Sequence, residues 1–394
     1  MLKRVQHDKF FMKILFFNYE YPPLGGGAAN ATAYILKEYS KIPDLSVDLI
    51  TSSIDSEYHL EKIGNNISIH KLPIGKNKNN LHYQSQKELL TYAWKAYFFA
   101  KKLIQKNDYD LSHSFFTVPC GFVSFLIKKK YNLPYIISLR GSDVPGYSDR
   151  FVFLYKIIKP LVKSIWKKSF AVISNSQGLR ELALKTNSKQ AVGIIHNGID
   201  ITDFVPKPER RPVDRIIITT GASRITDRKG IDYLIRAIKI LSSKYPNIHL
   251  KAMGDGNAKT NLENLAKELG LEKKVEFIGR ISRENTAPYY QEASIFVLPS
   301  FNEGMSNAML EALASGLPLI ATNTGGTSEL VEEGINGLVI KMKDSQDLAD
   351  KIEILMKDED LRKRMGEASR KKAEAMSWEK VAKDYDELYR KIKA

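Results

Sequence analysis

Two basic residues follow an apolar segment in the C-terminal half of the chain. Arg224 and Lys229 lie in GASRITDRKGIDYLIRA, where an apolar run ends and an amphipathic run begins. Two cations at the carboxyl end of a strand suit a diphosphate, because a guanidinium grips it as a planar fork and an ammonium as a point charge. Arg228 competes with Lys229 for the second role, and solvated surface charge is the plainer alternative.

Two glutamates lie farther along the chain, at Glu303 and Glu311. The pattern predicts Glu303 in a loop after a strand and Glu311 inside the following helix. The start of that helix, residues 305–307, would present backbone N–H groups to a phosphate. Carboxylates beside the phosphate would then accept hydroxyl groups of a sugar and a ribose.

A third candidate is the glycine cluster at residues 25–27, which follows a strand-like run and precedes the helix-like ANATAYILKEY. Residues without side chains let a phosphate or another backbone approach closely, and a helix start offers unpaired N–H groups. The spacing differs from the G-x-G-x-x-G fingerprint, and no acidic residue stands where a ribose would need it, so dinucleotide binding is weakly supported. A structural turn is the alternative.

Other chemistries find little support. The pairs Asp108/Asp110 and Asp384/Asp386 are expected on surface helices, away from the diphosphate, so no metal site is predicted. There is no G-x-S-x-G elbow, and the seven histidines form no convergent motif, which argues against a hydrolytic triad. The single cysteine, Cys120, excludes an internal disulfide and is expected to be a small buried side chain.

The elements that position these residues alternate in type along both halves of the chain. Short apolar runs and longer amphipathic stretches follow one another, which is typical of repeated βαβ units and a parallel sheet. Strands are expected at 13–17, 47–51, 67–70, 111–115, 135–139, 171–174, 192–196, 215–220, 248–253, 275–279, 294–299, 317–322 and 337–340. Helices are expected at 86–106, 151–168, 229–243, 258–269, 306–315 and 344–357, with a helical tail at 361–394.

A length of 394 residues predicts two domains rather than one core. The segment ITDFVPKPERRP has three prolines and no periodicity, so it is expected to be the hinge. We therefore expect a dispensable extension at 1–11, an N-terminal α/β domain at 12–203 and a C-terminal α/β domain at 204–376. The last helix, 377–394, is expected to pack back toward the N-terminal domain.

The net charge of +15 is concentrated in the first half. Residues 1–205 hold 28 Lys and Arg against 16 Asp and Glu, whereas residues 206–394 hold 32 against 29. This asymmetry favours an anionic partner such as nucleic acid, an acidic membrane surface or a phosphate-bearing substrate, with a solubilising surface as the alternative. Charged residues interrupt every apolar run, so no spanning helix is expected. The single cysteine fits a reducing compartment, and a cytoplasmic location is predicted.

One segment combines aromatic residues with lysines. FVFLYKIIKPLVKSIWKK, residues 151–168, could rest on an anionic bilayer at the inner face of the membrane. An ordinary amphipathic surface helix is the alternative interpretation.

The order of several motifs resembles one known family. The early GGG after PP, HNGID at 196–200, Arg224-x4-Lys229-Gly230, GDG at 254–256, FIGR at 277–280 and Glu303-x7-Glu311 occur in sequence over nearly the whole chain. In this order they resemble the retaining glycosyltransferases of family 4, which have the GT-B fold of two Rossmann-like α/β domains whose parallel sheets face a cleft.

The resemblance implies roles for particular residues. Arg224 and Lys229 would grip the donor diphosphate, Glu303 the donor sugar and Glu311 the ribose, with Arg224, Lys229 and Glu303 as the catalytic set. The segment at 279–282 would lie beside the base. The implied donor site comprises Gly25, Gly26, Gly27, Arg224, Lys229, Gly279, Arg280, Ile281, Glu303, Gly304, Met305, Ser306, Asn307 and Glu311.

Two departures from the family pattern concern the acceptor side. Many relatives have a histidine where this chain has Phe115, and His113 precedes it, so a catalytic histidine is not predicted. The family's His-Gly-x-Asp pattern is Arg140-Gly-Ser-Asp143 here. His113, Arg140 and Asp143 are acceptor-side candidates, with a structural histidine and an Arg–Asp bridge as the alternatives.

The resemblance implies an enzyme that moves a sugar from a nucleoside-diphosphate sugar to an acceptor hydroxyl with retention, without a metal or other cofactor. The acceptor would dock on the basic half, and a lipid-linked saccharide or another envelope glycan precursor would suit its charge. Alternatives are a sugar-nucleotide epimerase or hydrolase, and a noncatalytic protein that binds glycan or nucleic acid. Nucleic acid is not expected as a partner, because no aromatic-basic module is recognisable.

Overall fold

The computed structural model describes residues 11–76, 81, 83–147, 152–282, 285–303, 305–324 and 326–393. The chain forms two compact units, of which unit 1 is Met1–Asn197 with Trp378–Ala394 and unit 2 is Gly198–Ser377. The proline-rich segment expected to be the hinge thus belongs to unit 2, where Phe204 is buried in the core. The last helix is part of unit 1.

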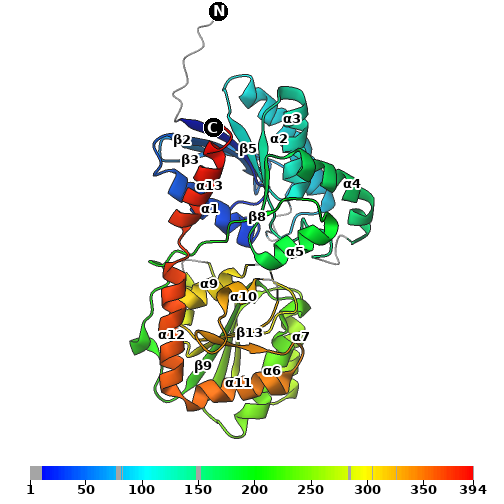
Figure 1. Cartoon of the computed structure of the whole chain (residues 1–394). Coiled ribbons are helices and arrows are strands. Elements are labelled where there is room, and N and C mark those ends of the chain that lie inside the picture. Colours follow the sequence, from blue (N-terminus) through cyan, green and yellow to red (C-terminus); the bar gives the residue numbers. More distant parts are fainter. Residues whose placement is uncertain are drawn as a thin grey trace, which may run out of the picture. The chain divides into compact units, whose positions relative to one another are not determined.

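Unit 1 is built on a twisted sheet of strands in the order β3-β4-β2-β1-β5-β6-β7-β8 (Figure 1). The strands are β1 (Met12–Phe17), β2 (Leu45–Ser52), β3 (His59–Ile63), β4 (Ile67–Leu72), β5 (Leu111–Phe115), β6 (Tyr135–Ser138), β7 (Ala171–Ser174) and β8 (Gly193–Ile194). All pairs are parallel except β3 with β4. Strand β3 was not predicted from the sequence, because it is an edge strand whose side chains are largely exposed and show no apolar alternation.

Helices cover both faces of this sheet. They are α1 (Gly27–Tyr39), α2 (Gln86–Ile104), α3 (Phe122–Tyr131), α4 (Val152–Lys168), α5 (Gln177–Thr186) and α13 (Trp378–Arg390). Right-handed crossovers toward β2 place α1 on one face, and crossovers toward β8 place α2, α3 and α4 on the other. The chain therefore leaves β1 and β5 in opposite directions, which opens a switch point between their carboxyl ends.

Helix α13 is held in unit 1 by buried hydroxyl groups. The Tyr389 hydroxyl hydrogen-bonds the Tyr39 hydroxyl at 2.8 Å and His113 Nδ1 at 2.7 Å. The Tyr385 hydroxyl lies 2.9 Å from Ser138 Oγ. Since buried polar groups need partners, these bonds join α13 to α1, β5 and β6.

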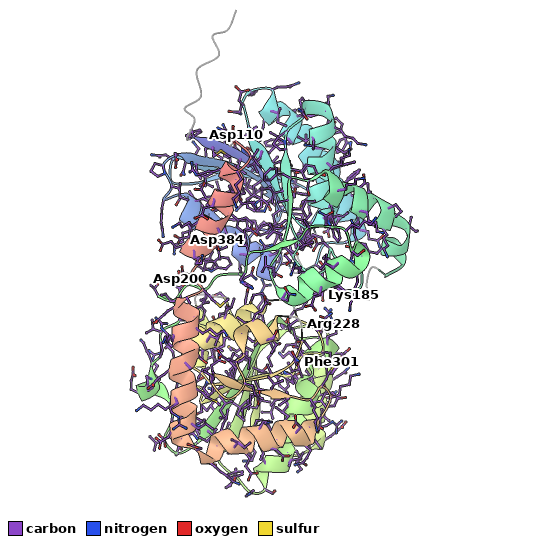
Figure 2. The ribbon with its side chains drawn as sticks, in the orientation of Figure 1. Asp110, Lys185, Asp200, Arg228, Phe301 and Asp384 are labelled. Atoms are coloured by element: carbon purple, nitrogen blue, oxygen red, sulfur yellow. The ribbon has the colours of Figure 1, made fainter. Side chains whose placement is uncertain are left out.

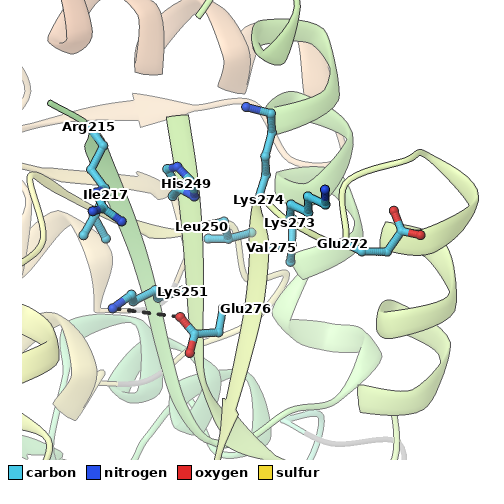
Figure 3. Close-up of a pocket in the computed structure, with 10 residues that line it drawn as sticks. All are labelled: Arg215, Ile217, His249, Leu250, Lys251, Glu272, Lys273, Lys274, Val275 and Glu276. Carbon is cyan, nitrogen blue, oxygen red and sulfur yellow. Dashed lines mark ion pairs between the residues drawn. The ribbon is translucent and has the colours of Figure 1, made fainter. Parts of the chain in front are cut away.

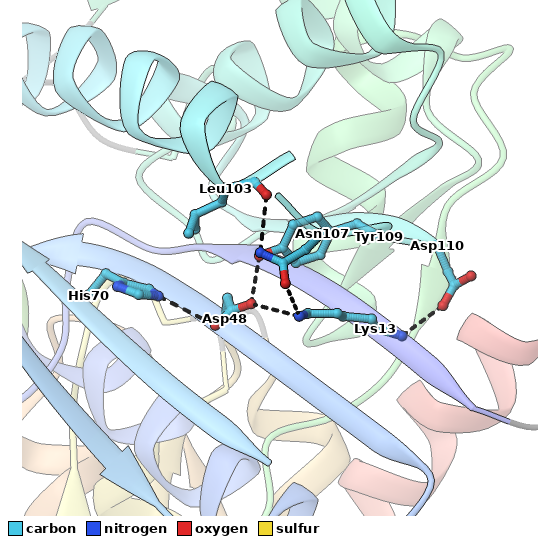
Figure 4. Close-up of polar contacts among 7 residues, drawn as sticks. All are labelled: Lys13, Asp48, His70, Leu103, Asn107, Tyr109 and Asp110. Carbon is cyan, nitrogen blue, oxygen red and sulfur yellow. Dashed lines mark hydrogen bonds and ion pairs between the residues drawn. The ribbon is translucent and has the colours of Figure 1, made fainter. Parts of the chain in front are cut away.

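A second polar network links strands β1, β2 and β4 (Figure 4). Asp48 on β2 accepts from the Tyr109 hydroxyl at 2.6 Å, and its other oxygen lies 3.4 Å from His70 Nε2 on β4. Lys13 Nζ on β1 lies 3.7 Å from the Asp48 carboxylate, and its backbone N–H donates to Asp110 at 2.7 Å. Asp108 and Asp110 thus lie in the connection between α2 and β5 and not on the surface helix expected for them.

Helix α4 directs its described aromatic side chains inward. Trp166 and Tyr155 are buried, and the Trp166 indole N–H donates to the Thr117 hydroxyl at 2.8 Å. Lys159 and Lys163 are exposed. The aromatic residues that suggested a bilayer contact at 151–168 therefore pack in the core as far as this helix is described, and α4 is an amphipathic surface helix.

Unit 2 repeats the architecture with strands in the order β11-β10-β9-β12-β13-β14, all parallel. The strands are β9 (Ile216–Arg224), β10 (Ile248–Asp255), β11 (Val275–Gly279), β12 (Ile295–Leu298), β13 (Leu319–Thr322) and β14 (Gly337–Ile340). The helices are α6 (Ile231–Ser242), α7 (Lys259–Glu268), α8 (Ala287–Gln291), α9 (Asn307–Ala314), α10 (Thr327–Leu330), α11 (Ser345–Lys357) and α12 (Glu359–Glu374), with short 3₁₀ turns at Pro208–Arg210 and Asp227–Lys229. Strands β9 and β12 flank the switch point of this sheet.

The helical tail expected at 361–394 is divided into two helices, and the second corresponds to the last helix expected at 377–394. Helix α12 ends at Glu374 and α13 begins at Trp378. Between them, the Ile199 N–H donates to the Met376 carbonyl at 2.9 Å, and Ile199 forms a parallel bridge with Ser377. The helix is interrupted where the chain passes back from unit 2 to unit 1.

Candidate functional site

The C-terminal candidates come from the carboxyl ends of two adjacent strands. Arg224 ends β9, and Lys229 lies in the short 3₁₀ turn that follows it. Glu303 follows β12, which pairs directly with β9. Because parallel neighbours end at the same edge of a sheet, the two loops meet at the switch point, where open α/β sheets bind ligands.

Lys229 and Glu303 form an ion pair across these loops. Lys229 Nζ lies 2.5 Å from Glu303 Oε1, with the side chains 22% and 11% exposed. The loops are also joined through the backbone, because the Phe301 N–H donates to the Arg228 carbonyl at 2.8 Å (Figure 2). The structure thus brings together the cation and the carboxylate that the sequence assigned to diphosphate and sugar.

Gly230 permits this close approach. Its φ is +63°, and an added Cβ would lie 2.3 Å from the Pro299 carbonyl oxygen. The Phe301 ring lies against Tyr233 at 5.8 Å between centroids, and Lys343 Nζ lies 5.0 Å from the same ring. Glycine is therefore required at residue 230 for the two loops to meet.

Arg224 is positioned by the GDG turn of β10. It pairs with Asp255 in the strand ladder, and the Ile225 N–H donates to the Asp255 carbonyl at 2.8 Å. A Cβ on Gly256 would lie 2.2 Å from the Ile225 carbonyl oxygen, so the turn packs tightly on the chain just after Arg224. The Arg224 side chain itself is partly exposed.

The start of α9 lies in the same loop as Glu303. Ser306 is the N-cap, and its hydroxyl accepts from the Met309 N–H at 3.4 Å. Met305 is buried and Asn307 is partly exposed as the first helical residue. Gly304 lies outside the described residues. The helix start is therefore near Glu303 in the chain, and its backbone N–H groups can favour an anion.

Glu311 lies on the following turn of α9 and is buried. Its Oε2 accepts from the Tyr290 hydroxyl of α8 at 2.8 Å. Gly221 makes room for that hydroxyl, which would lie 2.8 Å from a Cβ at this position of β9. Tyr290 was not predicted from the sequence, because a tyrosine in a five-residue helix gives no signal that would identify it.

The loop expected beside the base follows β11. Gly279 has a φ of +80° and open space around its Cβ position. Arg280 is exposed, whereas Ile281 is half-buried against the apolar core of unit 2. Strands β11, β10 and β9 are neighbours and parallel, so their carboxyl ends lie at the same edge of the sheet. The loop after β11 therefore lies at the same edge as Arg224.

In unit 1, the glycine cluster wraps around a carboxylate. Gly25 has a φ of +89°, and its Cβ would lie 2.5 Å from Glu20 Oε2. The Gly26 N–H donates to the same oxygen at 3.4 Å, and Gly26 is the N-cap of α1 without a capping side chain. Close packing on Glu20, a residue that the sequence analysis missed, explains why glycine is needed at residue 25.

His113 is a structural residue and not an acceptor-side one. Its side chain is fully buried and lies on the Phe16 ring at 4.6 Å between centroids. Nε2 hydrogen-bonds Ser138 Oγ and Nδ1 hydrogen-bonds the Tyr389 hydroxyl, both at 2.7 Å. Burial, followed by the charge of Arg140, holds the pKa of His113 well below its usual value. A substrate has no access to this imidazole in unit 1.

Arg140 and Asp143 also serve the fold of unit 1. Asp143 is buried and accepts from the backbone N–H groups of Arg140, Gly141 and Thr117 at 2.9, 3.1 and 2.8 Å. The Arg140 guanidinium lies over the Phe115 ring at 3.4 Å and donates to Asn197 at 2.9 Å. Asp143 is thus held by backbone N–H groups and not by the Arg–Asp side-chain bridge that was the alternative, whereas the acceptor role of Arg140 and Asp143 stays a prediction.

A groove of about 350 Å³ lies elsewhere on unit 2 (Figure 3). It is lined by Arg215, Ile217, His249, Leu250, Lys251, Glu272, Lys273, Lys274, Val275 and Glu276. These residues belong to the amino-terminal parts of β9, β10 and β11 or precede those strands, whereas the candidate site lies at the carboxyl ends. The groove is thus separate from the loops that hold Lys229 and Glu303.

Within residues 11–393, apart from the gaps given above, no three His, Cys, Asp or Glu residues are grouped so that they could hold a metal ion. Across the same residues, no helix has the length and apolarity needed to cross a membrane.

Comparison with known proteins identifies the family. Residues 25–203 match the family model of Glycosyltransferase Family 4, and residues 202–372 match that of Glycosyl transferases group 1. An uncharacterized glycosyltransferase of Methanocaldococcus jannaschii is 29% identical over 387 residues, which cover 96% of this chain and 99% of that protein.

Solved structures agree on the fold. A sucrose-phosphate synthase from Thermosynechococcus elongatus matches with a TM-score of 0.85 at 22% identity, covering 96% of this chain and 98% of that one. HepE from Anabaena in complex with UDP-glucose matches with a TM-score of 0.73 at 19% identity, covering 96% and 99%. The chain has the GT-B fold and belongs to the family 4, or group 1, glycosyltransferases.

Proposed function

We propose that this glycosyltransferase uses the switch point of unit 2 to bind a nucleoside-diphosphate sugar and transfers the sugar to an acceptor hydroxyl with retention. The observation that carries the proposal is the Lys229–Glu303 pair at 2.5 Å, which joins a cation and a carboxylate beside the start of α9. Pockets at this edge of parallel sheets commonly hold phosphates.

In this mechanism, Arg224, Lys229 and the N–H groups at the start of α9 stabilise the departing diphosphate. The bond between the anomeric carbon and the diphosphate oxygen breaks as the acceptor oxygen bonds that carbon from the same face. The acceptor proton moves to the departing phosphate oxygen, so no protein nucleophile is needed. Glu303 orients the donor sugar through its hydroxyl groups.

The Lys229–Glu303 ion pair affects how the donor binds. Since Lys229 and Glu303 neutralise each other at 2.5 Å, a diphosphate must compete with Glu303 for Lys229. The sugar hydroxyl groups then supply Glu303 with new hydrogen-bond donors. Diphosphate and sugar together thus replace the ion pair more fully than diphosphate alone.

The nucleotide base is proposed to be uracil, since HepE was solved with UDP-glucose and shares the fold.

The acceptor is proposed to be a saccharide, lipid-linked and destined for an envelope glycan or glycolipid. The excess of lysine and arginine in residues 1–205 supports an anionic acceptor. The enzyme would act in the cytoplasm, at the inner face of the membrane.

Thermal denaturation with nucleotides tests the donor site. A ligand that binds only the folded protein adds about 2.7 kcal/mol at a hundredfold excess over Kd. UDP should therefore raise the melting temperature, in EDTA as well as in buffer, because Arg224 and Lys229 take the place of a metal ion. UMP should act more weakly, and GDP and ADP test the base.

Arg224→Ala should largely abolish this rise, with Arg228→Ala as the matched control. Arg228 is exposed, and its backbone carbonyl makes the contact to Phe301, which the substitution leaves in place. Glu303→Ala should remove most transfer, and donor consumed without an acceptor would indicate a hydrolase. The donor site would be refuted if no nucleoside diphosphate stabilised the parent, or if Arg224→Ala responded like it.

A further inference from the structure

Helix α2 is apolar on two sides. Its inner side is formed by Tyr92, Ala96 and Ala100, which are fully buried in the core of unit 1. Its outer side carries three large apolar residues at every fourth position, Leu90, Trp94 and Phe98, which are 72%, 63% and 44% exposed. A surface helix needs one apolar side to pack, so the outer stripe is surplus to the fold.

The aromatic rings of the stripe support each other and are flanked by cations. The Trp94 and Phe98 rings meet edge to face at 5.2 Å between centroids, and Lys101 Nζ lies 5.3 Å from the Phe98 ring. Lys87 and Lys102 are exposed at the two ends of the stripe. The helix carries four lysines and one glutamate, and Glu88 is used in its capping box with Ser85.

From this arrangement we infer that the outer face of α2, defined as Leu90, Trp94 and Phe98 with Lys87, Lys101 and Lys102, docks on an anionic membrane surface. Trp and Phe rings favour the boundary between headgroups and acyl chains, and lysines reach the headgroups on their flexible stems. The charge of the helix complements anionic lipid, which distinguishes this partner from a second copy of the same basic chain.

The position of this face differs from the one the sequence suggested. On α4, Trp166 and Tyr155 are buried, and an aliphatic residue, Ile157, is 64% exposed. On α2, the aromatic side chains themselves are outside. This docking face would hold the enzyme at the surface where a lipid-linked acceptor lies. The inference therefore rests on the proposed function.

Sedimentation of the full chain with vesicles, without sugar donor or acceptor, tests the docking face. The parent should bind phosphatidylcholine vesicles containing phosphatidylglycerol and release in high salt. Trp94→Ala should weaken vesicle binding by roughly tenfold or more, because burial of one large apolar side chain strengthens an affinity by about tenfold or more. Lys101→Gln and Lys102→Gln should each weaken it by about fivefold.

Ile157→Ala is the matched control, because Ile157 is as exposed as Trp94 but lies on α4. It should bind like the parent, and an equal loss in both variants would overturn the assignment to α2. Equal binding of the parent to pure phosphatidylcholine would overturn the anionic partner. Self-association without vesicles that Trp94→Ala removes would indicate a second copy as the occupant and overturn the membrane.

Fluorescence gives a second readout, because Trp166 and Trp378, the other two tryptophans of the chain, are buried. Anionic vesicles should shift the emission to the blue and protect it from aqueous quencher. Trp94→Phe should lose the shift while still sedimenting with the vesicles. An unchanged parent spectrum would overturn the proposal. UDP should stabilise the docking variants as it does the parent, so failure here is distinguishable from failure of the donor site.

Discussion

Gly230→Ala tests the close contact between the loops that follow β9 and β12 in the candidate site. Gly230 has a φ of +63°, where a residue with a side chain is strained by about 1–2 kcal/mol. The new Cβ would also lie 2.3 Å from the carbonyl oxygen of Pro299 and 3.1 Å from the Phe301 ring. Overpacking of this kind costs about 1–3 kcal/mol. The free energy of unfolding should therefore fall by about 2–5 kcal/mol in total.

Gly270→Ala provides the matched control. Gly270 has nearly the same φ, +67°, but nothing lies within 4 Å of its Cβ position. It should show the backbone cost alone, about 1–2 kcal/mol. The difference between the two variants in urea denaturation therefore isolates the contact between the loops.

Nucleotide binding completes this test. Separation of the loops after β9 and β12 would pull Lys229 away from Glu303, so UDP should stabilise Gly230→Ala much less than it stabilises Gly270→Ala. Equal unfolding free energies, or equal responses to UDP in the two variants, would contradict a role for Gly230 in holding the two loops together.

Three further predictions concern polar contacts that are buried or partly buried. Tyr290→Phe removes the donor to Glu311 and should cost about 1.5–3 kcal/mol in urea denaturation, with a smaller thermal shift from UDP; an unchanged shift would argue against a positioning role. Burial opposes ionisation of Asp48, but the hydrogen bond from His70 and further contacts outweigh it and lower the pKa of Asp48. Its contribution is therefore present above the unfolded-state pKa and is lost as pH falls through the folded-state pKa, so the stability gap between the parent and Asp48→Asn should narrow below about pH 4. Tyr389→Phe leaves two buried partners without that hydroxyl and should lower the free energy of unfolding by about 1–3 kcal/mol, as measured by urea denaturation; no loss would refute the anchoring of α13.

The α/β architecture and the two loops of the candidate site could be predicted from the sequence. Each candidate followed an apolar run, so Arg224 and Glu303 were placed at strand ends by local pattern alone. That the strands in question are neighbours depends on topology, because β10 and β11 intervene in the chain but lie on the other side of β9. The adjacency of β9 and β12 was therefore expected only from the family resemblance, which the order of the motifs indicated.

Contacts made by tertiary packing were not accessible. Tyr290 and Glu20 act through partners that come close only when α8 and the glycine turn are in place. Asp143 stands at the expected strand end, but it captures backbone N–H groups of its own loop instead of facing outward. The exposed strand β3 lacks the alternation that identifies a half-buried strand.

The return of the chain to unit 1 has a consequence for the order of folding. Unit 2 is continuous from Gly198 to Ser377, whereas unit 1 needs α13 as well as the first 197 residues. During synthesis, the partners of Tyr389 and Tyr385 must wait until all of unit 2 has been made. A nascent chain halted at residue 377 would therefore carry a complete unit 2 attached to a unit 1 that still lacks helix α13 and the core contacts of that helix.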